Sequence, residues 1–259
     1  MFQRVNDPEI FSLGWAEQLP DGETNTISLP PDFLGNTRVT SYIYIENTYS
    51  YPNLVIDPLA FRSSQNSLTG FFLEFFDFGL QKDFNFLNGF NNLEDLIISQ
   101  ITNLTAFQYL PPLPSLQYLS VRNCPSELNQ IQFPDLSPAK LKALSLNDNE
   151  ISDHKADEIV AKLAASSSAE SLVSLDLSLN SLTRIPSQVG SSFPNLRTVY
   201  LIGNSISHIP PSSLTFTYPL MSINFHSNSI KRIESGAFQG KSTSARARNN
   251  NNSILYLFL

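Results

Sequence analysis

A single pattern of apolar and polar positions recurs four times in the second half of the chain. Each copy has large apolar residues at its first, fourth, sixth and eleventh positions and asparagine at its ninth. The copies are Leu141-x-x-Leu144-x-Leu146-x-x-Asn149-x-Ile151, Leu172-x-x-Leu175-x-Leu177-x-x-Asn180-x-Leu182, Leu196-x-x-Val199-x-Leu201-x-x-Asn204-x-Ile206 and Leu220-x-x-Ile223-x-Phe225-x-x-Asn228-x-Ile230. Residues two apart on a strand point to the same face. The fourth and sixth positions therefore predict a short strand with one buried face.

Weaker copies extend toward the N-terminus. Leu116-x-x-Leu119-x-Val121-x-x-Cys124 has cysteine in the asparagine position, and Leu93-x-x-Leu96-x-Ile98 has Ile101 there. We also expect degenerate copies at Leu68-x-x-Phe71-x-Leu73 and Val39-x-x-Tyr42-x-Tyr44-x-x-Asn47. The copies begin at residues 39, 68, 93, 116, 141, 172, 196 and 220, so most intervals lie in or near the range of about 20–29 residues that leucine-rich repeats have.

The predicted fold is an α/β solenoid: a leucine-rich-repeat horseshoe with a parallel concave sheet, a mostly irregular convex side and one helical repeat. Stacking lets each repeat bury an apolar face that it could not bury alone. The asparagines are expected to form a buried ladder, because their amides can bond backbone groups of adjacent coils. The ladder residues are Cys124, Asn149, Asn180, Asn204 and Asn228.

The 31-residue repeat that begins at Leu141 predicts an α-helix. Ser152 is a suitable N-cap, acidic residues follow it, and the chain reaches a serine-rich loop after Ala165. We interpret Asp153, Asp157 and Glu158 as the solvated start of this helix. The alternative is that they carry out acid–base chemistry. Phenylalanine is frequent, and we expect a spine of phenylalanines behind the strands that includes Phe61, Phe193, Phe216 and Phe238.

Composition and motifs argue against several classes of function. A formal net charge of −7 argues against a nucleic-acid partner, and one cysteine excludes an intrachain disulfide. The three histidines lie far apart, so we expect no metal site. No segment has the roughly 20 apolar residues of a membrane span, and residues 1–8 do not resemble a signal peptide. Common catalytic and nucleotide-binding motifs do not occur, so we expect no enzyme activity, no cofactor and no small-molecule substrate.

Three regions are expected along the chain. Residues 1–38 would be an N-terminal lead-in or degenerate cap, residues 39–240 the repeat array, and residues 241–259 an unstructured or artificial tail.

The concave face of the array is the expected place for a protein partner. Tyrosine and arginine are the residues most enriched in binding hot spots. Tyr118, Arg122 and Tyr200 are therefore the predicted anchors, with Asp176, Asn224 and His226 as polar neighbours. A solvated concave sheet without any single hot spot is the open alternative.

Residues 172–240 resemble arthropod proteins similar to the non-catalytic subunit of Oplophorus-luciferin 2-monooxygenase. The residues that carry the resemblance are Gly203-Asn204-Ser205-Ile206-Ser207, Ser222-Ile223-Asn224-Phe225 and Gly236-Ala237-Phe238-Gln239-Gly240. The resemblance implies an extracellular, secreted binding module or accessory subunit without chemistry of its own. The helical repeat and the lone cysteine support a different hypothesis, a cytoplasmic adaptor or inhibitor of the ribonuclease-inhibitor type.

Overall fold

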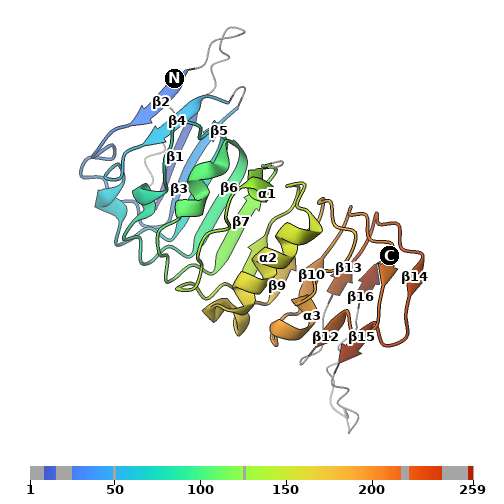
Figure 1. The fold of residues 1–259 in the computed structure, drawn as a ribbon. Coiled ribbons are helices and arrows are strands. Elements are labelled where there is room, and N and C mark those ends of the chain that lie inside the picture. The colour runs from blue at the N-terminus through green and yellow to red at the C-terminus, as the bar shows by residue number, and fades with distance from the viewer. Residues whose placement is uncertain are drawn as a thin grey trace. The chain divides into compact units, whose positions relative to one another are not determined.

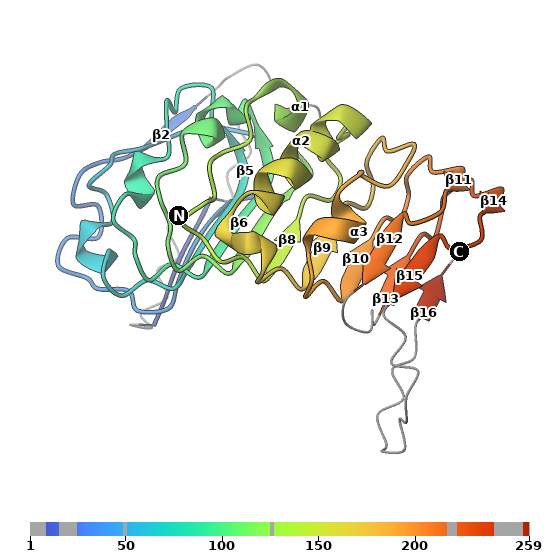
Figure 2. The ribbon, with the colours of Figure 1, turned by 60° about the horizontal axis from the view of Figure 1, so that its bottom comes forward.

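The computed structural model describes residues 9–15, 25–48, 51–124, 127–216, 222–240 and 256–258 (Figure 1). The chain divides into two compact units, Met1–Ala139 and Lys140–Leu259. Both units are built from parallel strands joined by irregular segments and short helices (Figures 1 and 2). This is the leucine-rich-repeat fold that the repeated pattern predicts.

The first unit is built on a parallel sheet whose strands follow the order β1-β3-β5-β6-β7. The strands are β1 (Ile10–Trp15), β3 (Tyr42–Asn47), β5 (Gly70–Asp77), β6 (Asp95–Thr102) and β7 (Tyr118–Arg122). A second short pair, β2 (Thr26–Leu29) and β4 (Asn53–Ile56), joins this sheet where Asn53 pairs with Asp77. Short 3-10 helices follow at Arg62–Ser64, Asn85–Leu87 and Leu104–Tyr109, and α1 spans Glu127–Gln130.

The repeat expected at Val39 was assigned one residue out of register. The structure pairs Ile43 with Phe71 and Ile45 with Leu73, and both isoleucines are buried. Tyr42 and Tyr44, which the pattern placed inside, lie instead on the opposite face and are half-buried. The physical reason is that isoleucine buries no polar atom, whereas each tyrosine hydroxyl would need a hydrogen-bond partner in the core.

Phenylalanine rings form one continuous chain through the core of the first unit. Phe84 is fully buried, and the centre of its ring lies 5.6 Å from that of Phe78, 5.1 Å from Phe86 and 5.8 Å from Phe107. Neighbouring contacts extend the chain to the rings of Phe33, Phe61, Phe71 and Phe133. Of the expected spine residues, Phe61 lies in this chain.

The other three expected spine residues lie in the second unit. Phe193 is buried, and Phe238 contacts Phe225 at 6.4 Å between ring centres. The side chain of Phe216 lies outside the described residues.

The second unit repeats shorter strands in the order β8-β9-β10-β13-β16. These are β8 (Ala143–Ser145), β9 (Ser174–Asp176), β10 (Thr198–Tyr200), β13 (Ser222–Asn224) and β16 (Tyr256–Phe258). Two small parallel pairs lie elsewhere on the coils, β11 (His208–Ile209) with β14 (Arg232–Ile233) and β12 (Leu214–Phe216) with β15 (Phe238–Gly240). Most of the expected tail, residues 241–259, lies outside the described residues, but its strand β16 pairs with β13.

The asparagines of the repeats line the inside of the second unit. The Oδ1 of Asn180 accepts hydrogen bonds from the backbone N–H of Asn149 at 3.2 Å and of Ile151 at 2.8 Å, and its Nδ2 donates to the carbonyl of Leu146 at 2.9 Å. Asn204 and Asn228 bond the preceding coil in the same way. Asn149 is fully buried, Asn180 and Asn204 are buried, and Asn228 is half-buried. Each amide thus joins one coil to the next.

In two repeats of the first unit the ladder position holds a large apolar residue, and the strands of these repeats are longer. Phe76 and Ile101 occupy the position there, and the two residues pair directly in the strand register. An apolar side chain cannot bond the backbone, so the backbone groups bond each other and β5 and β6 continue for eight residues.

Every ladder residue is preceded by a residue in the left-handed region. Examples are Asn123 (φ 50°) before Cys124, Leu179 (φ 55°) before Asn180, Gly203 (φ 65°) before Asn204 and Ser227 (φ 60°) before Asn228. This conformation turns the chain out of the strand and directs the following side chain inward. Asparagine and glycine suit it, whereas leucine adopts it at an energetic cost.

The expected helix is confirmed. Helix α2 (Asp153–Ala164) lies on one side of the sheet of the second unit (Figures 1 and 2), and the Ser152 hydroxyl caps it by accepting a hydrogen bond from the Lys155 N–H at 3.3 Å. Its buried stripe comprises Ala156, Ile159, Val160 and Leu163. Short helical turns follow at Ser167–Ala169 and at α3 (Val189–Ser192).

Candidate functional site

Three of the predicted partner-binding residues form one row on the second unit. Tyr200 of β10 pairs in register with Asp176 of β9 on one side and with Asn224 of β13 on the other. All three are half-buried, and they point away from the buried side chains of their strands. We call this side of a sheet its open face. His226 is exposed two residues beyond Asn224, whose Oδ1 accepts a hydrogen bond from the His226 N–H at 2.9 Å.

The other two predicted residues, Tyr118 and Arg122, lie at the two ends of β7 in the first unit. The Arg122 guanidinium bonds across two neighbouring strands, at 2.9 Å to the Glu74 carboxylate and at 3.3 Å to the Ser99 hydroxyl. Arg122 therefore already serves as a cross-strand clamp. The six predicted residues therefore form two sets, one on each unit.

An aromatic cluster on the open face of the first unit was missing from the predicted set. Tyr44 stacks on Phe72 with ring centres 4.3 Å apart and planes 15° apart, and Tyr42 lies 5.6 Å from Phe72. The Tyr42 ring lies against the backbone of Gly70, where a Cβ atom would come within 2.1 Å of Tyr42 Cδ1. No decisive signal for this cluster is present in the sequence, because isoleucines and tyrosines alternate at 42–45 and the spacing fits either pair inside.

Cys124 occupies the ladder and is not available as a nucleophile. It is fully buried, its Sγ accepts a hydrogen bond from the Ile101 N–H at 3.4 Å, and the thiol donates to the Arg122 carbonyl at 3.3 Å. Burial raises the pKa of the Cys124 thiol to about 12. Since the thiolate is the reactive form, the folded chain keeps this sulfur unreactive.

We expect Cys124 to react with a thiol reagent such as dithionitrobenzoate at least about 100-fold more slowly in the folded chain than in the unfolded chain at about pH 8, where an unperturbed thiol is partly ionised. The colour released on reaction measures the rate, and the single cysteine makes the signal unambiguous. The same chain in denaturing guanidinium chloride is the control. Equally fast labelling in both states would contradict the buried ladder position.

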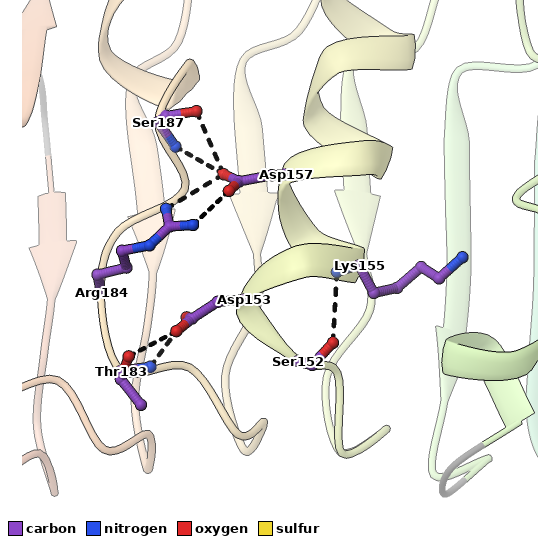
Figure 3. Close-up of polar contacts among 7 residues, drawn as sticks. All are labelled: Ser152, Asp153, Lys155, Asp157, Thr183, Arg184 and Ser187. Carbon is purple, nitrogen blue, oxygen red and sulfur yellow. Dashed lines mark hydrogen bonds and ion pairs between the residues drawn. The ribbon is translucent and has the colours of Figure 1, made fainter.

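The acidic residues of α2 bind the repeat that follows (Figure 3). The Asp157 carboxylate accepts hydrogen bonds from the Arg184 guanidinium, the Ser187 N–H at 2.9 Å and the Ser187 hydroxyl, and Asp153 accepts from the Thr183 N–H at 3.0 Å. Burial alone would raise the pKa of Asp157, but the hydrogen bonds from Arg184 and Ser187 and the charge of Arg184 together lower it. Asp157 is therefore held as an anion that joins two repeats.

Glu158, the third acidic residue considered for acid–base chemistry, is engaged in the same helix. Its carboxylate lies 2.6 Å from Nζ of Lys155 and 3.8 Å from Nζ of Lys162. Lys155 is buried, so this ion pair stabilises a charge that would otherwise lie unpaired inside the protein. Asp153 and Asp157 thus attach the helix to the next repeat, whereas Glu158 forms ion pairs within the helix.

The described residues of the first unit also form a surface depression. One open depression in the first unit is lined by Asp32, Gly35, Asn36, Arg62, Ser63 and Gln65, and Arg62 is ion-paired with Asp32 at its rim. Within the described part of the chain, no group of three or more His, Cys, Asp or Glu side chains is placed to hold a metal ion. None of the described helices is both long and apolar enough to cross a bilayer.

Comparison with known proteins agrees with the fold. Residues 194–242 match the leucine rich repeat family. The chain is also similar to Tsukushi of Gallus gallus, with 29% identity over 123 residues, which make up 44% of this chain and 32% of Tsukushi. The aligned stretch thus spans about a third of that relative. Together with the ladder and the parallel strands, these similarities support the leucine-rich-repeat fold of the chain.

Proposed function

We propose that this chain is a non-catalytic protein-binding module whose partner docks on the open faces of its sheets. The observation that carries the proposal is the row on the second unit, where Tyr200 is flanked by Asp176 and Asn224. A tyrosine combines a large apolar ring with a polar tip, and polar groups on both sides can orient a partner around it.

The neighbouring row on the same face supports Tyr200 as the anchor. Ser174, Thr198 and Ser222 are paired across β9, β10 and β13, next to the row that contains Tyr200. Their small side chains leave the tyrosine ring as the largest group on this part of the face. A partner with a complementary hollow would bury the ring and release the water around it.

A role without chemistry is supported by what the nucleophilic and acidic candidates do. Cys124 is buried in the ladder, and Asp153, Asp157 and Glu158 are bonded within α2 or to the next repeat. Substrate chemistry at Cys124, Asp153 or Asp157 would first require breaking contacts between repeats, and at Glu158 it would require breaking ion pairs within α2.

The setting that we propose is a secreted scaffold or accessory subunit, which is what a resemblance of residues 172–240 to the arthropod non-catalytic subunit would imply. The twelve-residue helix α2 favours a second candidate, an intracellular adaptor or inhibitor of the ribonuclease-inhibitor type. Immunoblots of the medium and of the lysate of source cells separate the two. A protein found only in the lysate would reject the secreted role.

We expect Tyr200→Ala and Tyr118→Ala each to weaken binding of a partner captured from source tissue by at least about 1 kcal/mol, the usual size of a hot-spot effect. Calorimetry or surface plasmon resonance with the purified partner measures the change. Tyr109→Ala is the matched control, because Tyr109 is an exposed tyrosine on the 3-10 helix Leu104–Tyr109 and lies outside the strand rows. Unchanged affinity in both open-face variants would reject docking on these faces.

A further inference from the structure

Two glutamates lie side by side on the open face of the first unit. Glu46 of β3 pairs in register with Glu74 of β5. Like charges directly opposite each other on neighbouring strands destabilise a sheet. Arg122 neutralises Glu74 at 2.9 Å. Among the residues that the structure describes, no lysine, arginine or histidine forms an ion pair with Glu46, which is exposed.

Tyr44 lies two residues before Glu46 on β3, and Phe72 covers one of the two faces of its ring. Phe72 of β5 stacks on one face of Tyr44, so the other face of the Tyr44 ring is turned toward β1. On β1 the residue in register with Tyr44 is Ser12, and the residue in register with Glu46 is Gly14. Both residues are small, so within the described part of β1 no large side chain lies in register with the ring.

The Glu46 carboxylate is directed toward the same side. A Cβ atom on Gly14 would lie 3.7 Å from Oε1 of Glu46, so this side chain leans over β1. Tyr44 and Glu46 are two residues apart on one strand, and their side chains leave the sheet about 7 Å apart on the same face. One planar group above Ser12 and Gly14 could therefore contact both the ring and the carboxylate.

The group that this arrangement suits is a guanidinium. Arginine stacks its planar head on aromatic rings and pairs with a carboxylate through two parallel N–H groups, whereas lysine offers a compact charge without a plane. The chain itself pairs an arginine with the glutamate of the neighbouring strand, where the Arg122 guanidinium donates one hydrogen bond to Glu74. We propose that the outer face of Tyr44 and the carboxylate of Glu46 bind an arginine side chain of a partner protein.

The surrounding charge is consistent with a cationic ligand. Asp95 lies on the same open face, and burial followed by the charge of Glu94 raises the pKa of its carboxyl group. Burial, and after it the neighbouring groups Tyr42 and Asp95, also raises the pKa of Tyr44. The carboxyl groups of Glu46, Glu74 and Asp95 all lie on this open face, and Arg122 pairs with one of them, Glu74.

This inference rests on the proposed function, since it names the chemistry of the partner on one of the open faces. Its test does not need the partner. The peptide acetyl-Gly-Gly-Arg-Gly-Gly-amide is titrated into the isotope-labelled full chain and followed by NMR. We expect a dissociation constant on the order of 10 mM, which weakens as salt is added. The same peptide with citrulline, the neutral isostere of arginine, should bind at least about threefold more weakly.

Two variants locate the site. Tyr44→Leu and Glu46→Gln should each weaken binding of the arginine peptide by about threefold to tenfold. Glu46→Gln should at the same time leave the melting temperature unchanged or raise it, because it removes the repulsion from Glu74. If Glu46 had a purely structural role, Glu46→Gln would instead lower both the affinity for the peptide and the melting temperature. Tyr109→Leu and Glu170→Gln, at exposed positions outside this face, are the matched controls.

Equal binding of the arginine and citrulline peptides would overturn the inference, as would unchanged affinity in both site variants. Binding of a neutral oligosaccharide such as chitohexaose at Tyr44, without a response to the arginine peptide, would also overturn it and would assign the ring to a sugar. A captured partner that loses affinity with Tyr200→Ala while the arginine peptide fails to bind would reject this inference alone and leave the proposed function standing.

Discussion

Asn180→Ala is expected to lower the free energy of unfolding of the second unit by about 4 kcal/mol. The Asn180 amide accepts hydrogen bonds from the backbone N–H groups of Asn149 and Ile151 and donates to the carbonyl of Leu146. Alanine leaves at least two of these buried groups without a partner, and each such group costs roughly 1–3 kcal/mol. It also leaves a small void between two coils, which adds to the loss.

Denaturant unfolding followed by circular dichroism measures this change. Asn195→Ala is the matched control, because Asn195 is a half-buried asparagine of the same unit whose Nδ2 donates one solvent-exposed hydrogen bond, to the carbonyl of Glu170. We expect that control to lose less than about 1 kcal/mol. Asn180→Asp should be as destabilising as alanine or worse, since a carboxylate cannot donate to Leu146. If alanine at position 180 cost no more than alanine at 195, the buried ladder would not be what joins the coils.

Phe84→Ala should destabilise the first unit by a similar amount, about 3–5 kcal/mol. The Phe84 ring contacts the rings of Phe78, Phe86 and Phe107, and its side chain is fully buried. Alanine removes the ring from the middle of the chain of aromatic side chains. The cost combines the lost transfer of apolar surface with a cavity that three rigid neighbouring rings cannot easily fill.

The same unfolding measurement applies, with Phe84→Leu as the matched variant. Leucine keeps most of the apolar volume but loses the edge and face contacts between rings, so we expect a loss of roughly 1–2 kcal/mol. A control at Tyr109, which is exposed on the 3-10 helix Leu104–Tyr109, should change stability by less than about 0.5 kcal/mol on substitution by alanine. A Phe84→Ala chain as stable as the Tyr109→Ala chain would show that the aromatic chain contributes little to the core.

The candidate site was only partly foreseeable. The row around Tyr200 follows from the repeat, because the residue between the fourth and sixth positions of each copy must point away from the core. The cluster around Tyr44 did not follow, because two isoleucines and two tyrosines alternate at 42–45 and the pattern alone fits either pair inside. Register with Phe71 and Leu73 of the neighbouring strand decided the matter, and a shift of one residue moves every side chain of a strand to the other face.

The sequence by itself determined the repeat, the ladder and the helix of the long copy, because each depends on spacing within one coil and on residue types that only one environment suits. Only the tertiary structure decided which side chains meet between coils: the pairing of Arg122 with Glu74, the attachment of Asp157 to Arg184, and the stack of Tyr44 on Phe72. Those partners lie between 27 and 48 residues apart in the chain. Their contacts depend on how successive coils are aligned, and that alignment is a property of the stack and not of any single repeat.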